Sequence, residues 1–191
     1  NRDVKPGGLN EYGIAAYKTV DDFAQKEVDY ILSIGGIELR NECTLGKDIQ
    51  LPDLVDEYDA VFLGIGLSGS NALGIEGENK KGVVNATDYI AALRQADDKT
   101  TLPVGRTVVV IGGGMTAIDI AVQSRHLGAE QVHMVYRRGP EKMSASEFEQ
   151  ALAQTSGVKI HHRAPPKRVL GEEHVKGVEF ETDSGKLVLY A

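Results

Sequence analysis

The sequence has one cysteine and no tryptophan. Cys43 is the single cysteine among 191 residues. It therefore forms no disulfide, CxxC redox pair or four-ligand zinc site within this chain. We interpret it as a small apolar side chain in a strand, and a chain so poor in cysteine fits a reducing cytoplasm, which is the expected location.

Basic residues and long apolar runs are also scarce. There are 21 lysines and arginines against 28 acidic residues, which gives a formal charge of -7. General binders of the nucleic-acid backbone are usually basic, so nucleic acid is not an expected partner. The longest apolar stretch, 108–121, contains three glycines and Asp119. It does not supply the roughly 20 consecutive apolar residues of a membrane span, so no membrane partner is expected.

The remaining composition is that of a folded α/β protein. Hydrophobic residues make up 41% of the chain and charged residues 26%, and its 22 glycines suggest many turns. A chain of 191 residues is long enough for one ordinary domain with a second, smaller piece.

The second half of the chain alternates between strand and helix patterns. The segments are, in order, strand 106–112, helix 115–128, strand 131–137, helix 144–157, strand 158–163 and a hairpin over 174–191. Strands that alternate with helices form parallel sheets. The sequence therefore predicts an α/β fold, with a Rossmann-type parallel sheet, flanking helices and a C-terminal β-hairpin.

The first half has a less regular pattern. Apolar spacing predicts a helix over 19–36 and another over 86–96, where Thr87 marks the start. Alternation over 37–42 predicts a strand, and the nearly continuous apolar run over 58–66 is typical of a strand buried on both faces.

The most informative motif is the stretch VVVIGGGMTAIDIA at 108–121. A dinucleotide site needs a glycine for the turn, a second where backbone approaches the pyrophosphate, and a small residue where the helix packs on the strand. Gly112, Gly114 and Ala117 have this spacing, and the pyrophosphate would lie at the positive end of the following helix. A plain tight turn is the alternative, but the strand before the motif and the helix after it favour nucleotide binding.

The end of the next strand indicates which nucleotide is preferred. An acidic residue there would bind the ribose of NAD, whereas this chain has Tyr136 followed by Arg137 and Arg138. Paired guanidinium groups favour the 2′-phosphate of NADPH, although a solvated basic loop is the alternative. Asp119, one turn into the preceding helix, either faces the nicotinamide or only complements the helix dipole.

The histidines and serines carry weaker signals. His161 and His162 are adjacent on a strand and so point to opposite faces, which is poor geometry for a shared metal. The other histidines are scattered, and we interpret all of them as surface or core residues. Ser144 or Ser146 is expected to cap the helix that follows.

With these motifs in place, the chain resembles the flavoprotein family that includes the small subunit of bacterial glutamate synthase and the pyridine-nucleotide half of dihydropyrimidine dehydrogenase. The similarity lies in PGGLNEYGIAAYK, YDAVFLGIG, LGIEGENKKGV and the long stretch at 108–149. Within the family, the dihydropyrimidine dehydrogenase subunit looks most similar.

The resemblance implies an NAD(P)H-dependent, FAD-containing oxidoreductase that passes a hydride from NAD(P)H to FAD for onward electron transfer. Residues 1–80 would be part of the flavin domain with a linker, and residues 81–191 the NAD(P)H-binding domain. The pyrophosphate loop would consist of Gly112, Gly113, Gly114, Met115, Thr116 and Ala117, and the 2′-phosphate site of Arg137 and Arg138. Relatives usually have Asp or Asn at this position, so Met115 removes a polar side chain from beside the pyrophosphate.

The resemblance also implies partners. Gly8 and Leu9 would lie against the flavin, whose binding segments would be mostly outside this chain. We expect the chain to be part of a longer protein with an iron–sulfur segment and a catalytic partner subunit, and to be inactive alone. Two alternatives remain: a non-catalytic nucleotide sensor, and a pyridine nucleotide-disulfide reductase whose cysteines lie outside the chain.

Overall fold

The computed structural model describes residues 1–67 and 69–191, which divide into two compact units. The first unit spans Asn1–Gly69 and the second Ser70–Ala191. The helices of the first unit are α1 (Leu9–Tyr12), α2 (Phe23–Ser33) and α3 (Leu51–Glu57). The second unit contains α4 (Ala86–Gln95), η1 (Lys99–Thr101), β1 (Thr107–Ile111), α5 (Met115–His126), β2 (Gln131–Val135), η2 (Pro140–Lys142), α6 (Glu147–Thr155), β3 (Val158–His161), β4 (Pro166–Leu170), β5 (Gly177–Thr182) and β6 (Gly185–Tyr190).

A three-stranded parallel sheet forms the centre of the second unit. Its strand order is β1-β2-β3, and the register places Val135 of β2 beside both Ile111 of β1 and His161 of β3. The helices α5 and α6 connect the strands, as the alternating pattern predicted. Because the strands are parallel, their carboxyl ends lie at one edge of the sheet, which is where α/β folds bind ligands.

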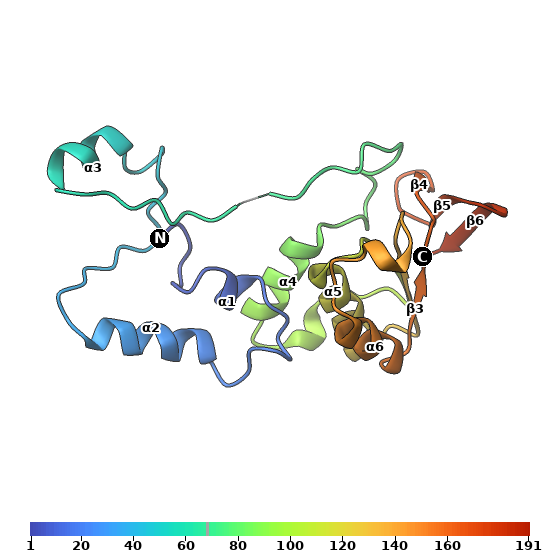
Figure 1. The fold of residues 1–191 in the computed structure, drawn as a ribbon, viewed down its shortest axis with the longest axis horizontal. Helices are drawn as coiled ribbons and strands as arrows, with labels where there is room; N and C mark the ends of the chain where they lie inside the picture. The colour runs from blue at the N-terminus through green and yellow to red at the C-terminus, as the bar shows by residue number, and fades with distance from the viewer. Residues whose placement is uncertain (68) are drawn as a thin grey trace. The chain divides into compact units, whose positions relative to one another are not determined.

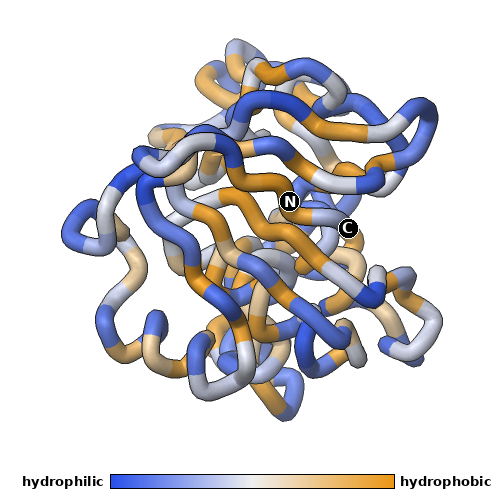
Figure 2. The backbone as a smooth tube through the Cα atoms, turned by 90° about the vertical axis from the view of Figure 1, so that its right-hand side faces the viewer, coloured by the Kyte–Doolittle hydropathy of each residue, from blue (hydrophilic) through white to orange (hydrophobic). Residues whose placement is uncertain are grey.

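Helices cover one face of this sheet, and a second sheet covers the other (Figure 1). Every residue of α5 from 117 to 124 is buried, because this helix packs on β1 and β2 and is itself flanked by α4 and α6. In Figure 2 the strands that face the viewer carry long hydrophobic stretches. Among the described residues, no helix combines the length and apolar character needed to cross a membrane.

The second sheet is antiparallel, with the order β4-β5-β6. The predicted hairpin is confirmed as β5 and β6, in which Thr182 pairs with Gly185 across a two-residue turn. The strand β4 was not predicted, because Pro165 and Pro166 precede its apolar residues; a proline at the first position of a strand removes no ladder bond. The parallel and antiparallel sheets meet in an apolar cluster that includes Val135, Phe180 and Leu189.

The segment before α4 attaches to the antiparallel sheet. The amide of Val169 in β4 donates to the carbonyl of Glu76 at 2.8 Å, and that of Lys81 donates to the carbonyl of Glu173 at 3.0 Å. A Cβ atom at position 77 would lie 2.6 Å from the Val169 carbonyl oxygen, so only glycine fits there.

The first unit confirms one prediction and overturns two. The helix predicted over 19–36 is α2, which is shorter. The strands predicted over 37–42 and 58–66 are wrong, since no described residue in either range lies in a strand. A strand exists through its pairing with a neighbour, and neither range has a paired neighbour among the described residues. Phe62 is consequently 95% exposed, although the residues on either side of it in the sequence have the composition of a buried strand.

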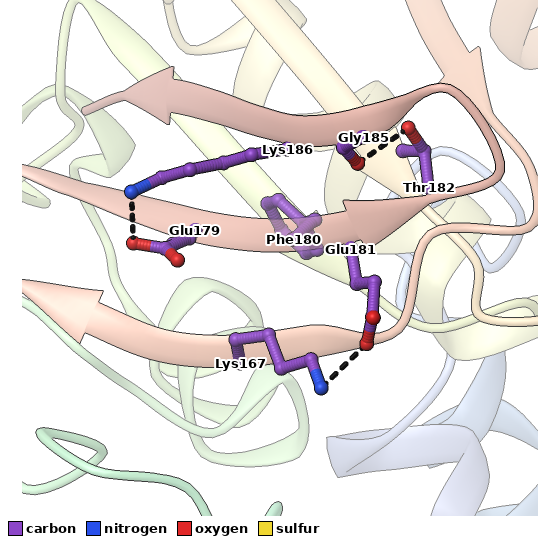
Figure 3. Close-up of a pocket in the computed structure, with 7 residues that line it drawn as sticks. All are labelled: Lys167, Glu179, Phe180, Glu181, Thr182, Gly185 and Lys186. Carbon is purple, nitrogen blue, oxygen red and sulfur yellow. Dashed lines mark hydrogen bonds and ion pairs between the residues drawn. The ribbon is translucent and has the colours of Figure 1, made fainter.

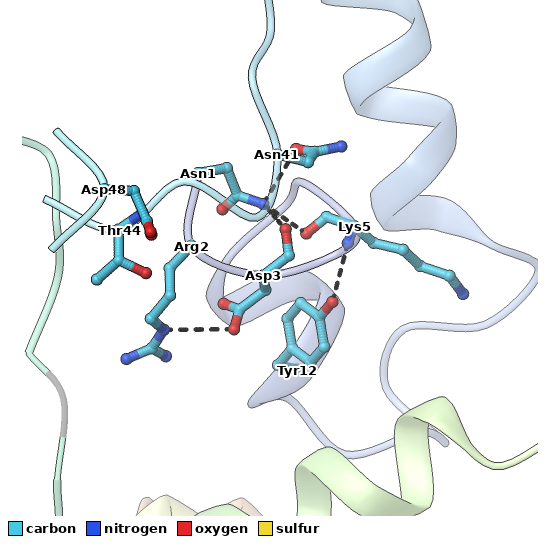
Figure 4. Close-up of polar contacts among 8 residues, drawn as sticks. All are labelled: Asn1, Arg2, Asp3, Lys5, Tyr12, Asn41, Thr44 and Asp48. Carbon is cyan, nitrogen blue, oxygen red and sulfur yellow. Dashed lines mark hydrogen bonds and ion pairs between the residues drawn. The ribbon is translucent and has the colours of Figure 1, made fainter.

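Hydrogen bonds organise the beginning of the first unit (Figure 4). The side-chain amide of Asn1 donates to the carbonyls of Asp3 and Lys5 at 2.7 and 2.9 Å, and to Oδ1 of Asn41 at 3.2 Å. The Lys5 amide donates to the Tyr12 hydroxyl oxygen at 3.1 Å, which ties this segment to α1. Polar contacts therefore hold the segment that begins at Asn1 in place, because its residues bury little apolar surface.

The apolar cluster between the two sheets yields a test of the fold. Phe180 is fully buried, so Phe180→Ala should lower the free energy of unfolding by about 3–5 kcal/mol through lost contacts and a cavity. Phe148, which is 78% exposed, is the matched control, and Phe148→Ala should change this quantity by less than about 0.5 kcal/mol. Urea denaturation measures both; equal losses would contradict the described packing.

Candidate functional site

The glycine loop that connects β1 to α5 begins as an extension of the parallel sheet. The Gly112 amide donates to the Val135 carbonyl at 3.0 Å, which continues the pairing of β1 with β2. A Cβ atom at position 112 would lie 3.1 Å from Cβ of Ala117. Helix and strand therefore approach closely at the two positions where the motif requires small residues.

The middle glycine lies against an aromatic ring. A Cβ atom at Gly113 would lie 2.4 Å from Cδ2 of Tyr136, so any side chain there would displace the ring. The Tyr136 hydroxyl donates to the Lys142 carbonyl at 2.7 Å, and the Ala145 amide donates to the Gly113 carbonyl at 3.2 Å. The loop 136–146, defined by these contacts, is thus closed against the glycine loop.

The N-terminus of α5 has free hydrogen-bond donors. Gly114 is the N-cap residue, and no side chain caps the helix. The amides of Ala117 and Ile118 both donate to the Gly114 carbonyl, whereas within the described chain the amides of Met115 and Thr116 donate to no acceptor. Free amides and the helix dipole together favour an anion, and a phosphate fits this position better than an uncharged group does.

Two serines at the end of loop 136–146 have different roles. Ser146 caps α6, since its Oγ accepts from the Glu149 amide at 3.3 Å, which confirms the predicted cap. Ser144 Oγ would lie 3.2 Å from a Cβ atom at Gly114, and so it borders the glycine loop. From the sequence, Ser144 was expected only as a cap. Its place shortly after the arginine pair was the one available signal that it borders the glycine loop.

The arginine pair lies just beyond the end of β2. Tyr136 still belongs to the sheet edge, because its amide donates to the His161 carbonyl at 2.8 Å. Arg137 and Arg138 are both exposed, and neither guanidinium forms an ion pair or hydrogen bond within the part of the chain that the structure describes. Arg106 differs, as it binds the Glu130 carboxylate through two hydrogen bonds. The pair therefore offers free positive charge at the carboxyl edge of the sheet.

The other candidate residues lie in different surroundings. Asp119 is only 5% exposed inside α5, whereas Met115 at the start of the same helix is 55% exposed. Both roles considered for Asp119 remain predictions. Gly8 is the N-cap residue of α1 with φ 53°, and Leu9 is 72% exposed. They belong to the first unit, and their contact with a flavin remains a prediction.

A hollow of about 240 Å³ on the antiparallel sheet is a poor candidate for the site (Figure 3). Lys186 Nζ lies 2.7 Å from the Glu179 carboxylate, and Lys167 Nζ lies 2.5 Å from that of Glu181. The hydrogen bond from Lys186, with a further one from Arg168, holds the pKa of Glu179 below its usual range. The charges in this hollow neutralise one another, so little is left to bind a ligand.

A histidine pair lies on the sheet face opposite α5. Nδ1 of His133 in β2 lies 3.0 Å from Nε2 of His161 in β3, and the two rings are stacked. Burial lowers the pKa of both imidazoles, and the nearby Lys159 ammonium lowers both further. His162 instead lies 3.3 Å from the Met143 sulfur. From the sequence, His133 was one of the scattered histidines and His161 was expected to lie beside His162 alone. The register of β2 and β3, which makes His133 and His161 diagonal neighbours, does not follow from spacing along the chain.

The fold and the loop geometry define an α/β domain of the dinucleotide-binding type. A family model described as pyridine nucleotide-disulphide oxidoreductase matches residues 8–191. The chain belongs to this oxidoreductase family, which confirms the family resemblance inferred from its motifs.

Named relatives support the same conclusion. The chain is 37% identical over 177 residues to NADPH-Fe(3+) oxidoreductase subunit beta of Geobacter sulfurreducens, covering 91% of this chain and 26% of the relative. It is 34% identical over 197 residues to the glutamate synthase [NADPH] small chain of Escherichia coli, covering 97% and 42%. The chain thus spans less than half the length of these relatives.

Solved structures share the fold. Mycobacterium tuberculosis FprA in complex with NADPH superposes with a TM-score of 0.78 at 17% identity, covering 100% of this chain and 59% of FprA. Thioredoxin reductase of T. acidophilum gives a TM-score of 0.61 at 14% identity, covering 99% and 64%. At these identities the similarity establishes the fold alone.

The histidine pair predicts how stability depends on pH. Because the folded state lowers both pKa values below about 6.5, the unfolded chain binds more protons than the folded one as the pH falls through that value. The free energy of unfolding should therefore be highest above neutral pH and decrease upon mild acidification. Urea titrations between about pH 8 and pH 5 measure this slope.

Replacing both imidazoles tests the cause of this slope. The double variant His133→Gln, His161→Gln should flatten the dependence on pH, whereas His174→Gln, at an exposed position, should leave it unchanged. An unaltered slope in the double variant would show that other groups are responsible.

Proposed function

We propose that residues 81–191 bind NAD(P)H and hold its nicotinamide against an FAD that is bound largely by segments outside this chain. The observation that carries the proposal is the uncapped N-terminus of α5 at the end of β1, with free amides at Met115 and Thr116. The pyrophosphate would accept hydrogen bonds from this first helical turn, lined by Gly112, Gly113, Gly114 and Ala117. FAD, when bound, accepts the hydride; the residues of this chain contribute position and electrostatics.

The free positive charge beside this loop supports a preference for NADPH. Arg137 and Arg138 are exposed at the carboxyl edge of the sheet, where the ribose of the nucleotide would lie. Tyr136 takes the place of the acidic residue that binds an unphosphorylated ribose, and its ring lies against Gly113. A phosphate monoester would be bound by two guanidinium groups in charge-assisted hydrogen bonds.

The first unit supports the flavin part of the proposal. Its apolar run over 58–66 has the composition of a buried strand, yet Phe62 and Ile65 are 95% and 72% exposed. We infer that residues 1–80 complete a flavin domain whose other strands lie outside this chain, with Gly8 and Leu9 beside the flavin. Two relatives are a subunit beta and a small chain, which supports a catalytic partner subunit here. An iron–sulfur segment rests on the family resemblance alone.

The branch of the family and the final electron acceptor are finer proposals. A glutamate synthase small-chain type is supported by the relative in Escherichia coli. The dihydropyrimidine dehydrogenase type, like a cytoplasmic location, rests on the sequence motifs alone. A disulfide reductase would need cysteines from outside this chain, because Cys43 is the single one in it.

Flavin reduction distinguishes an oxidoreductase from a non-catalytic nucleotide sensor. Anaerobic addition of NADPH to the purified full-length protein should bleach its flavin absorbance if the proposal holds. Saturable NADPH binding without bleaching would instead indicate a nucleotide sensor.

Removal of the arginine pair tests the nucleotide preference. In calorimetric titrations of the full-length protein, the double variant Arg137→Ala, Arg138→Ala should weaken NADPH binding about tenfold to a hundredfold, because charge-assisted hydrogen bonds to phosphate are lost. NADH binding should hardly change, since NADH lacks the 2′-phosphate.

A double variant of equal charge is the control. Arg106→Ala, Arg168→Ala removes two arginines that are each paired with a glutamate, and it should leave the ratio of the NADPH and NADH dissociation constants unchanged. Equal binding of both nucleotides by the wild-type protein would contradict the role of Arg137 and Arg138 while leaving the glycine loop as the pyrophosphate site.

A further inference from the structure

Arg163, just beyond the end of β3, has a strained backbone. Its φ is 54°, in the left-handed region that long side chains rarely occupy. The other described non-glycine residues with positive φ are Asp21, Asp22 and Glu42, all in the first unit. Strain of this kind persists where surrounding structure enforces it, and it is frequent at ligand sites.

Hydrogen bonds tie this strained residue to the arginine pair. The Arg163 amide donates to the Arg138 carbonyl at 2.9 Å, and the next amide, that of Ala164, donates to the Tyr136 carbonyl at 3.1 Å. Together with the bond from the Tyr136 amide to the His161 carbonyl, these contacts join the segments after β2 and β3. The left-handed bend therefore places Arg163 directly beside Arg138 at the carboxyl edge of the sheet.

The charge of Arg163 is unbalanced at this position. Its side chain is exposed, and within the residues that the structure describes it forms no ion pair or hydrogen bond. Arg40, Arg106 and Arg168 are each paired with a glutamate. Within the described residues, Arg137, Arg138 and Arg163 thus form no ion pair, although the chain has an excess of acidic residues. A bound anion at this edge of the sheet would balance the charge of these exposed side chains.

We propose that Arg163 is a third phosphate-binding residue that determines the preference for NADPH. It would act with Arg137 and Arg138 on the 2′-phosphate, whose three terminal oxygen atoms can accept further hydrogen bonds after two bidentate guanidinium contacts. The inference rests on the proposed function of the glycine loop. It adds a residue from the segment after β3 to a specificity site that the motifs place only after β2.

The variant Arg163→Asn tests this role without disturbing the backbone. Asparagine tolerates the left-handed conformation better than arginine does, so the variant should fold at least as stably as the wild type. Calorimetric titration of the full-length protein should show NADPH binding weakened about tenfold, with NADH binding unchanged. Arg106→Asn is the matched control, since it removes the same charge from an ion pair with Glu130, and it should leave both affinities unchanged.

The possible outcomes separate this inference from the proposed function. If the wild type prefers NADPH and Arg163→Asn keeps that preference, the role of Arg163 is overturned and the glycine loop stands. Equal weakening of NADPH and NADH would also overturn it, because it would indicate a structural role. Failure of the folded wild-type protein to bind either nucleotide would overturn the proposed function itself.

Discussion

The contact between the Tyr136 ring and the backbone of Gly113 is the constraint on which the site depends. No side chain fits between them, since a Cβ atom at Gly113 would lie 2.4 Å from the ring. The Tyr136 hydroxyl donates a hydrogen bond to the Lys142 carbonyl, and the Ala145 amide donates one to the Gly113 carbonyl. Tyr136 thus links the glycine loop to loop 136–146, which carries the arginine pair. This contact holds the free amides at the start of α5 close to the loop that carries Arg137 and Arg138.

The parallel sheet provides the second structural constraint on the site. Because β1, β2 and β3 run in the same direction, the glycine loop, the arginine pair and Arg163 all follow carboxyl ends at one edge. Two layers cover the sheet, with α5 buried on one face and the antiparallel sheet packed on the other. The chain has a net charge of -7, yet this edge carries unpaired positive charge. Such a local charge reversal attracts a phosphorylated ligand without making the whole surface basic.

The sequence predicted those parts of the fold that local pattern determines. The course from β1 to β3 and the β5–β6 hairpin follow from apolar periodicity, glycines and caps, and the glycine loop lies where its motif indicated. The strands expected over 37–42 and 58–66 were wrong because strands need partners, and periodicity does not show whether a partner is present. The His133–His161 pair and the approach of Arg163 to Arg138 depend on strand register, which spacing along the chain does not reveal.

The proposed pyrophosphate site for a pyridine nucleotide is the first turn of α5. A crystal structure of the full-length protein with saturating NADPH tests it most directly. We expect pyrophosphate oxygens within hydrogen-bond distance of the Met115 and Thr116 amides, above the glycine loop. NADPH bound elsewhere on the protein, with this turn left to solvent, would contradict the proposed pyrophosphate site.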